Sequence, residues 1–564
     1  MAAFASGAGL LYRSLSTAGL QTVFHSIRSR LGPCLTALLC ALLAIAGCTG
    51  TPTRPVVAAA VVAASPLRPL PAGWQRGAFA EIYVRAYRDS DGDGIGDLRG
   101  LTQSLDYLAA LGVRGLWLMP VTASQDHNHG YATTDYRNIE PAYGSLADFD
   151  ELLRQAHARG IGVIIDYVIN HSAAEHPYFQ QALHDRNSVY RRWYVWRDAK
   201  PEGWSIWDHD PWTVTPTGAY FHVFSPTMPD FDFHEPAVEA FHEANLRFWL
   251  DRGVDGFRFD AVTHLFEKDA RDWRDQPESL GLMGRLRAVV DAYRNRFVVC
   301  EATHQQREYA SPTVCGNAFA MDLSKQLFDA ARGDSEAIRT VADYFVDAPV
   351  GMASMLSNHD LFAGDRAWNQ LGGDIAQYKL AAASYLLRPG TPFILYGEEV
   401  GMAAADIQGD SRVRAPMPWT GDPRTAGFTA GTPFRALPAN IVTQNVSAEQ
   451  ARTDGLLAWY RDLLRVRNIY PSLSVGSYLA PQVSGQVSAF QRNEGSERSL
   501  VLVNDGLGDG GIDIAGLPPG GHFRQVFPRG ATDRFDALAD GRARRRLAGQ
   551  SVRVYVAQAR GGGD

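Results

Sequence analysis

The chain reads Gly256-Phe257-Arg258-Phe259-Asp260 at a point where a short apolar run ends in a carboxylate. The pattern recurs twice: residues 297–300 are followed by Glu301, and residues 353–356 are followed by Ser357-Asn358-His359-Asp360. Each apolar run is typical of a buried strand, so each acid is expected at the C-terminal end of a strand. Acids are costly to desolvate, and a fold that places three of them at strand ends is expected to use them.

Short apolar runs alternate with amphipathic stretches from Trp74 onward, which predicts alternating strands and helices and a parallel sheet. Eight runs are predicted as strands: residues 80–87, 115–119, 162–169, 253–259, 297–300, 318–321, 353–356 and 393–396. Eight parallel strands with helical crossovers close into a barrel, and its functional side chains lie in the loops after the strands. The predicted fold class is therefore α/β, a (β/α)8 TIM barrel.

Two further parts are expected beside the barrel. A long Trp-rich insertion follows the third strand and is predicted to form a small lobe at the barrel mouth. Beyond Tyr470-Pro471-Ser472 the pattern changes to short strands and turns, which predicts a C-terminal antiparallel β domain. The predicted domains are a signal segment (1–47), a Pro/Ala-rich tether (48–73), the catalytic barrel (74–170 and 233–468), the inserted lobe or domain B (171–232) and the C-terminal β domain (469–564).

The N-terminus has the pattern of a targeting segment. Arg28 and Arg30 precede an apolar stretch of 16 residues, 31–46, which leads into Ile45-Ala46-Gly47-Cys48. This ending resembles a bacterial lipobox and predicts cleavage before Cys48 and lipid attachment to its sulfur. The alternative is an uncleaved anchor, but the stretch is short for a span of about 20 residues. We therefore expect an exported bacterial protein, held by lipid in the periplasm or outer membrane, or else secreted.

Composition narrows the function classes. Of the 564 residues, 46% are hydrophobic and 20% charged, as in a globular protein with a large core. A formal net charge of −7 gives no reason to expect a nucleic-acid partner. Besides Cys34, Cys40 and Cys48 near the N-terminus, the chain has only Cys300 and Cys315. The sequence leaves their pairing open and favours a buried thiol at Cys300, because it lies inside an apolar run.

Asp260 and Glu301 have different surroundings in the sequence, which predicts different protonation states. Arg258 points to the same face of its strand as Asp260, so its guanidinium is expected to keep that carboxylate ionised. Glu301 has no such cation beside it and follows an apolar run, which favours a raised pKa. One ionised and one protonated carboxyl group at close range suit glycosidic bond hydrolysis. The alternative is a set of buried structural ion pairs, which also occur in barrels.

A series of motifs in the same order strengthens this interpretation. The motifs are residues 89–100, 130–131, 166–171, 228–232, 256–264, 301, 358–360, 389–392 and 416–419. Together they resemble the α-amylase family of glycoside hydrolases over residues 74–473, and the resemblance implies retaining chemistry on an α-glucan substrate. It implies that Asp260 is the nucleophile, Glu301 the general acid/base and Asp360 the transition-state stabiliser.

The same resemblance implies a set of substrate-binding residues. Tyr131 matches the family's stacking platform, and His171 and His359 match its partners for the sugar in the cleavage subsite. His264 lies where the family contacts the leaving group. Asp166 is expected to support Arg258 from the neighbouring strand. The alternative for each histidine is a structural role, but Asn170 and Asp360 beside them favour a functional one.

An acidic loop follows the first predicted strand and is a candidate calcium site. Its alternating carboxylates and glycines allow a tight turn to direct several oxygens at one cation. It begins like an EF-hand loop, but Gly100 occupies the twelfth position and a strand precedes it. It resembles instead the calcium loop of the family's α-glucosidase-like branch. The implied Ca²⁺ ligands are Asp89, Asp91, Asp93, the Ile95 carbonyl and Asp97; the alternative is a solvated acidic turn.

The finer activity rests on one departure from a family pattern and one further resemblance. Exo-acting α-glucosidase relatives have an Asp after Gly-Tyr, whereas this chain has Ala132, which favours endo attack on longer α-1,4-glucans. Residues 228–230 resemble members between the oligo-1,6-glucosidases and the neopullulanases. We therefore expect an α-amylase-type hydrolase of starch, maltodextrins or malto-oligosaccharides. The alternatives are an exo-acting α-glucosidase or oligo-1,6-glucosidase, an α-glucan transglycosylase, or a non-catalytic subunit, which the acid pair argues against.

Overall fold

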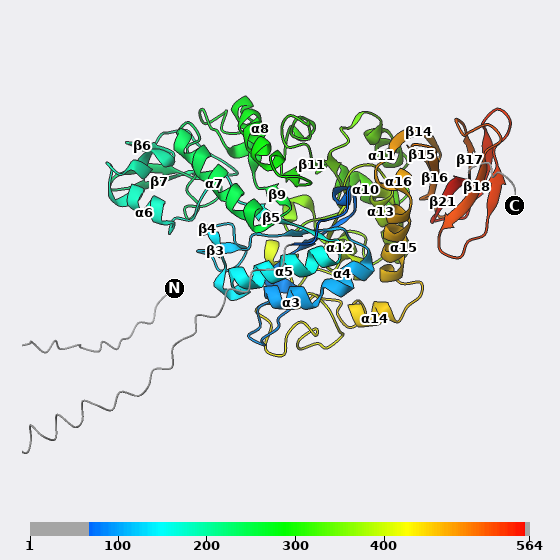
Figure 1. Ribbon diagram of the computed structural model, residues 1–564, viewed down its shortest axis with the longest axis horizontal. Coiled ribbons are helices and arrows are strands. Elements are labelled where there is room, and N and C mark those ends of the chain that lie inside the picture. The colour runs from blue at the N-terminus through cyan, green and yellow to red at the C-terminus, as the bar shows by residue number, and fades with distance from the viewer. Residues whose placement is uncertain (1–66, 559–564) are drawn as a thin grey trace, which may run out of the picture. The chain divides into compact units, whose positions relative to one another are not determined.

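A computed structural model describes residues 67–558 of the chain (Figure 1). The predicted signal segment, the lipid site at Cys48 and most of the predicted tether lie outside these residues. The end of the tether prediction is corrected, because Leu67 and Leu70 pack against core clusters of the barrel. Within residues 67–558, none of the helices combines the length and apolar character needed to span a membrane.

The eight predicted strands form one parallel sheet. In chain order they are β1 (Phe79–Ile82), β2 (Gly115–Leu118), β5 (Gly162–Tyr167), β9 (Gly256–Phe259), β10 (Phe297–Cys300), β11 (Ala318–Phe319), β12 (Met352–Ala353) and β13 (Phe393–Leu395). The sheet order is β12-β11-β10-β9-β5-β2-β1-β13, and every pair is parallel. A parallel bridge between Ser354 and Pro392 joins the two edges. The predicted (β/α)8 barrel is confirmed.

The first strand is shorter than predicted. The expected strand 80–87 ends at Ile82, and Val84–Tyr87 forms a helical turn, α2. The β-branched and aromatic residues of this turn imitate a strand in the sequence, but Val84 and Tyr87 are buried at the barrel mouth rather than paired in the sheet. The predicted strands 115–119, 162–169, 318–321, 353–356 and 393–396 also overrun the observed ends by one to three residues, and the predicted strand 253–259 starts three residues before β9. The chain forms a loop or turn at these positions.

The barrel interior is layered, because alternate residues of each strand face inward. An apolar layer at one level includes Phe79, Trp117, Ile164, Phe297 and Phe393, which belong to one buried cluster. Two positions further along three strands, the inward residues are ionisable: Glu81 on β1, Asp166 on β5 and Arg258 on β9. The polar layer therefore lies toward the C-terminal ends of the strands, above the apolar one.

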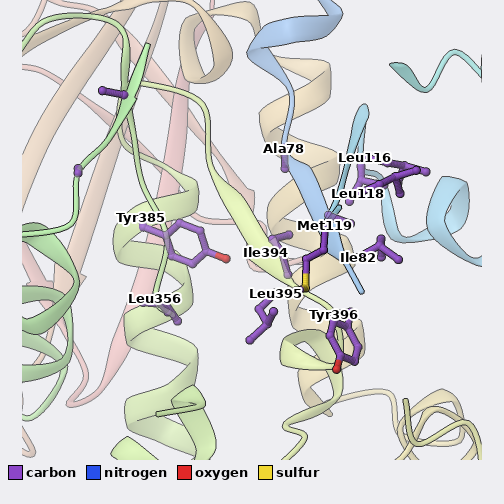
Figure 2. Packing of buried hydrophobic residues seen from close by; sticks show 14 of the residues in the cluster. Ala78, Ile82, Leu116, Leu118, Met119, Leu356, Tyr385, Ile394, Leu395 and Tyr396 are labelled. Atoms are coloured by element: carbon purple, nitrogen blue, oxygen red, sulfur yellow. The ribbon is translucent and has the colours of Figure 1, made fainter. Parts of the chain in front are cut away.

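The opposite faces of the strands pack against the surrounding helices. Figure 2 shows Ile82 of β1, Leu116 and Leu118 of β2 and Ile394 of β13 among side chains of the large buried cluster that includes Tyr385 of α13 (Ile375–Leu386). Burial of apolar side chains is the main stabilising term for such a fold. The sheet is thus covered outside by helices and filled inside by its own side chains.

Local signals in the sequence account for several helix ends. A capping box of Ser145 and Asp148 starts α5, and α7 starts at Pro236 and stops at Gly253, which adopts a left-handed conformation. The α-helices after α2 are α3 (Leu98–Gln103), α4 (Leu105–Leu111), α5 (Leu146–Ala158), α6 (Pro177–His184), α7 (Pro236–Arg252), α8 (Pro277–Asp291), α9 (Gln306–Tyr309), α10 (Leu323–Ala331), α11 (Ser335–Asp347), α12 (Ala367–Gln370), α13 (Ile375–Leu386), α14 (Val446–Gln450), α15 (Leu456–Ile469) and α16 (Pro471–Ser474).

Two excursions follow strands β2 and β5. After β2, strands β3 (Thr122–Ser124) and β4 (Thr133–Ile139) form an antiparallel hairpin. After β5, the inserted segment contains α6 and the three-stranded antiparallel sheet β6-β8-β7, with β6 at Trp196–Arg197, β7 at Trp212–Thr215 and β8 at Gly218–Phe221. Trp212 and Phe221 belong to a small buried core of this segment. The segment thus has a core of its own beside the barrel.

The C-terminal part is antiparallel, as predicted. A six-stranded sheet has the order β14-β15-β16-β21-β18-β19, and β17 pairs with β20. The strands are β14 (Ser477–Ser484), β15 (Val487–Glu494), β16 (Glu497–Asn504), β17 (Gly510–Ile514), β18 (His522–Phe527), β19 (Arg534–Asp536), β20 (Ala543–Leu547) and β21 (Ser551–Gln558). A separate apolar cluster, which includes Leu500 and Phe523, lies in this part of the chain.

Cys300 and Cys315 form a disulfide, which corrects the expectation of a free buried thiol at Cys300. Both cysteines are fully buried, and the bond closes a loop with a sequence separation of 15. The loop begins with Glu301 and contains His304. The sequence could not show the pairing, because Cys315 approaches the end of β10 only after the loop has folded back.

Removing this bond is expected to destabilise the barrel. The variant Cys300→Ala/Cys315→Ala should lose about 3 kcal/mol of unfolding free energy, the value for closure of a loop of roughly 15 residues. The midpoint of denaturant unfolding measures the change. A reducing agent should lower the midpoint of the parent protein and leave that of the double variant unchanged. Equal midpoints for the oxidised parent and the variant would contradict the prediction.

Candidate active site

A cavity of about 650 Å³ lies at the C-terminal ends of the barrel strands. It is lined by residues from several strand-end loops, the β3–β4 hairpin and the inserted segment. The lining includes Asp260 and Glu301, which directly follow β9 and β10, and Asp360 in the loop after β12. The fold therefore brings the three strand-end acids into one cavity, as the sequence predicted. His171 and Tyr131 are part of the same wall.

Arg258 is the centre of the charge network below this cavity. Its guanidinium is fully buried and forms ion pairs with Asp166, Asp260 and Glu301. Nη1 lies 2.9 Å from Asp166 Oδ1, and Nη2 lies 2.8 Å from Glu301 Oε1. The indole ring of Trp117 packs 5.2 Å from the guanidinium carbon. Three carboxyl groups therefore share one cation in a site with little solvent.

This geometry corrects the expected division of charge. The sequence predicted contacts of Arg258 with Asp260 and Asp166, but the guanidinium also pairs with Glu301. Burial raises the pKa of Asp260 to about 6, with Arg258 opposing the shift. Burial raises the pKa of Glu301 to about 7. The charge of Arg258 opposes this rise, and the charges of Asp260 and Asp360 add to it. The predicted raised pKa of Glu301 is supported. Arg258 lowers the pKa of Asp260, as expected, but burial outweighs it, and a pKa of about 6 leaves Asp260 mostly ionised at neutral pH.

The main chain also holds Glu301. The N–H of Ala261 donates to Glu301 Oε2 at 3.1 Å. Ala261 has a φ of 50°, in the left-handed region that residues with a side chain rarely adopt. Such strained residues cluster at functional sites, where the surrounding structure enforces them. The turn after Asp260 thus directs a donor at the carboxyl group on the neighbouring strand.

Asp360 lies in a cationic environment. Its Oδ2 is 3.1 Å from His359 Nε2, and Arg414 donates a hydrogen bond to its Oδ1 at 2.5 Å. Burial opposes ionisation, but the positive charges of His359 and Arg414 outweigh it and lower the pKa of Asp360 well below its usual range. Asp360 is therefore a permanent negative charge in the cavity near neutral pH.

The predicted substrate-binding residues lie in or directly below the cavity. Tyr131 is between β3 and β4, and its hydroxyl donates to Asp166 Oδ2 at 3.1 Å. His171 Nε2 is 3.2 Å from the Tyr131 carbonyl, and burial lowers its pKa to about 3. Burial also lowers the pKa of His264 to about 3, and its ring stacks on Trp273 with centroids 5.2 Å apart. Both histidines are thus neutral at physiological pH.

Several lining residues were not found in the sequence. Arg414 and Asp410 lie more than 40 residues beyond Asp360, in a long stretch without a strand pattern. Trp207, Phe224 and Phe362 form an apolar rim, and Trp207 and Phe362 are 53% and 60% exposed. The Trp-rich insertion signalled the first of these, but its composition did not show which tryptophan reaches the cavity.

Three carboxylates lie close together in the acidic loop that follows α2. One oxygen from each of Asp89, Asp91 and Asp97 lies within 4.8 Å of the others. Asp93 is outside this group, and its Oδ1 accepts a hydrogen bond from the Ile95 N–H at 2.7 Å. Asp89 also accepts hydrogen bonds from the N–H groups of Gly92 and Gly94. Hard carboxylate oxygens at this spacing fit a calcium ion.

Comparisons with known proteins agree with this site. Residues 81–476 match the family model described as "Alpha amylase, catalytic domain". The chain is 33% identical over 480 residues to the trehalose synthase/amylase TreS of Mycolicibacterium smegmatis, covering 74% of this chain and 80% of the relative. It is 34% identical over 441 residues to α-amylase 3 of Dictyoglomus thermophilum, covering 76% and 85%. The solved α-glucosyl transfer enzyme XgtA superimposes with a TM-score of 0.75 at 29% identity, covering 86% and 99%.

The barrel and its clustered carboxyl groups define an enzyme that acts on glycosidic bonds. The chain belongs to the α-amylase family of glycoside hydrolases, as its sequence motifs indicated.

Proposed function

We propose that this protein cleaves α-1,4-glucosidic bonds of starch, maltodextrins or malto-oligosaccharides with retention, through a covalent glycosyl-enzyme intermediate. The observation that carries the proposal is the contact of both Asp260 and Glu301 with one guanidinium at the base of one cavity. Asp260 contacts Nη1 of Arg258 and Glu301 contacts Nη2. Two carboxyl groups bound to the two ends of one guanidinium suit the separation of roughly 5 Å that a retaining mechanism needs.

In the first step Asp260 is the nucleophile and Glu301 the acid. Three carboxyl groups around Arg258 cannot all ionise without strong repulsion, and Glu301, with a pKa of about 7, is the one suited to keep a proton. A carboxylate oxygen of Asp260 bonds to the anomeric carbon as the bond to the leaving oxygen breaks. Glu301 gives its proton to that oxygen, so the departing sugar leaves as an alcohol.

In the second step the now ionised Glu301 takes a proton from water as the water oxygen attacks the anomeric carbon. The bond to Asp260 breaks and its carboxylate is restored, so two inversions retain the configuration. Asp360, ionised beside the cavity, stabilises the positive charge that develops on the sugar in both transition states. Tyr131 offers a ring for stacking, and His171 and His359 offer hydrogen bonds to sugar hydroxyls.

A product profile tests the proposed bond specificity. A long malto-oligosaccharide, isomaltose and sucrose are each incubated with the enzyme, and the products are followed by chromatography over time. Early release of mid-length fragments from the malto-oligosaccharide supports endo attack on α-1,4 bonds. Exclusive glucose release, or faster cleavage of isomaltose, would assign the protein instead to the exo-acting α-glucosidases or oligo-1,6-glucosidases.

Glucosyl transfer is the second candidate function. The exposed apolar rim of Trp207, Phe224 and Phe362 could bind an acceptor sugar and exclude water from the intermediate. Relatives named trehalose synthase/amylase and α-glucosyl transfer enzyme support this candidate. With maltose as the only substrate, transfer would give trehalose or longer oligosaccharides, whereas hydrolysis gives glucose alone.

We also propose a structural calcium ion held by Asp89, Asp91 and Asp97, with Asp93 and the Ile95 carbonyl completing the set that the family resemblance implies. The spacing of the three carboxylates supports it. The ion would neutralise repulsion among them and tie the loop together. This site is separate from the acids that line the cavity.

Removing calcium is therefore expected to lower thermal stability. At a calcium concentration about 100 times the dissociation constant, binding contributes about 2.7 kcal/mol. Adding a chelator should lower Tm by a few degrees. The variant Asp91→Asn should have a lower Tm and lose its response to the chelator. An unchanged Tm of the parent protein after chelation would contradict the site.

The N-terminal sequence supports a proposal on location. We propose export, with lipid attached to Cys48 and residues 49–66 linking it to the fold. The disulfide between Cys300 and Cys315 fits an oxidising compartment. Mass spectrometry of the mature protein should find a lipid-modified Cys48 at its N-terminus. An unmodified Cys48 would exclude the lipid.

A further inference from the structure

Glu81 is a buried carboxylate to which the proposed reaction gives no role. It lies on β1, two residues after Phe79, and its side chain is 1% exposed. Its Oε1 accepts a hydrogen bond from the main-chain N–H of His359 at 3.1 Å and lies 2.6 Å from His359 Nδ1. Its Oε2 has no hydrogen-bond partner among the described residues. An ionised group buried in this way is costly unless a cation faces it.

The other side of the His359 ring faces oxygen as well. Its Nε2 lies 3.1 Å from Asp360 Oδ2 and 2.6 Å from the Tyr131 hydroxyl. The Tyr131 hydroxyl itself donates to Asp166, so its lone pairs are free to accept from Nε2. The ring is fully buried, and it packs against the ring of Trp117 in a T-shaped arrangement with centroids 5.6 Å apart. Both ring nitrogens can donate to these oxygens only when both carry a proton.

We propose that Glu81 is a positioning residue that keeps His359 in its doubly protonated form and so holds Asp360 and Tyr131 in place for the reaction. This inference rests on the proposed function of the cavity for its effect on catalysis. Glu81 and Asp360 would hold the imidazolium from opposite sides. The arrangement resembles the way a carboxylate fixes the orientation of a catalytic histidine.

The surrounding charges support this arrangement. Four groups that carry oxygen face His359: Glu81 from β1, Tyr131 from the hairpin, the neighbouring Asp360 and Asp166 from β5. A cation beside these groups, Arg414, donates a hydrogen bond to the main-chain carbonyl of His359. Burial alone would lower the pKa of His359, but Asp360 and Glu81 raise it to about 10. Because Glu81 supplies a full negative charge, an amide in its place would keep the shape and lose that stabilisation.

The variant Glu81→Gln tests the proposal. It preserves an oxygen that can accept from Nδ1–H but removes the charge. We expect kcat to fall roughly 10- to 100-fold with a smaller change in KM. The pKa of His359 should fall from about 10, so 15N NMR of the histidine-labelled variant should show His359 losing its second proton at lower pH than in the parent. Glu81→Asp, which restores the charge, should recover part of kcat. The matched control is Glu449→Gln, another buried glutamate, bonded to Arg452 and Leu457.

A second measurement does not depend on a variant of Glu81 folding, nor on activity. In the parent enzyme labelled with 15N-histidine, one histidine should remain doubly protonated at about pH 8, well above the usual pKa of 6.5. The spectrum of His359→Gln assigns that signal. A neutral His359 at this pH, or a Glu81→Gln enzyme with the parent's kcat and the parent's pKa of His359, would overturn the proposal. Failure of the proposed function would appear elsewhere, as undiminished activity after replacement of Asp260.

Discussion

The variant Asp260→Asn is expected to lose at least roughly 10⁴-fold in kcat, because an amide cannot form the glycosyl-enzyme bond. Removing the nucleophile of a covalent mechanism costs several orders of magnitude, and what remains comes from binding and electrostatics. Initial rates on a malto-oligosaccharide measure the loss. The control is Asp291→Asn, the same change on α8 at a side chain that is 53% exposed. More than a tenth of the parent activity in Asp260→Asn would exclude Asp260 as nucleophile.

The variant Asp260→Asn should be at least as stable as the parent, although its activity is lost. Because burial raises the pKa of Asp260 to about 6, its ionised form is less favourable in the folded chain than in the unfolded one. A carboxyl group with a raised folded pKa destabilises the fold as pH rises from the unfolded pKa through the folded pKa. At neutral pH, Asp260→Asn should therefore keep or raise Tm while activity is lost. Such an outcome separates loss of chemistry from loss of folding.

The variant Glu301→Gln is expected to lower kcat/KM on malto-oligosaccharides by roughly 10² to 10⁴, the usual contribution of a general acid. The reason is that the departing sugar alcohol needs a proton and glutamine has none to give. A substrate with an acidic leaving group, such as a 4-nitrophenyl glucoside, needs no proton for the first step. Its cleavage to the glycosyl-enzyme should be affected far less, which a burst of nitrophenol measures.

The pH dependence identifies the same group. Activity of the parent enzyme should rise as Asp260 ionises, with a pKa of about 6, and fall as Glu301 loses its proton, with a pKa of about 7. The variant Glu301→Gln should lack the alkaline fall. The control is Glu308→Gln, an exposed glutamate on the short helix α9 after the same strand. A flat profile of the parent from about pH 4 to 9 would be inconsistent with this pair.

Much of the fold could be read from the sequence, because its signals are local. The apolar runs around Phe257 and Val298 are too short for helices and end in polar residues, so both strands and their C-terminal ends were predictable. The first strand was predicted too long, because Val84 and Tyr87 look like strand residues. Their burial in a helical turn depends on contacts with chain more than 300 residues away, such as the Trp419 ring 5.4 Å from Tyr87.

The candidate site was predictable in its residues and not in its contacts. Asp260, Glu301 and Asp360 each follow a strand, which is enough to place them at the barrel mouth. The contact of Arg258 with Asp166 was expected from the family resemblance, but its contact with Glu301 was not, because Glu301 follows β10 and joins Arg258 only through the pairing of β9 with β10. Glu81 could have been noticed as an acid inside an apolar run, but its partner lies 278 residues away.

The sequence by itself determined the barrel, the family and the three strand-end acids, because strand periodicity and motif order depend only on the order of residues along the chain. The tertiary structure alone decided the protonation of the site, the disulfide and the role inferred for Glu81. The physical reason is that the pKa of a buried group depends on desolvation and on charges brought close from distant strands. Those distances exist only once the sheet has closed.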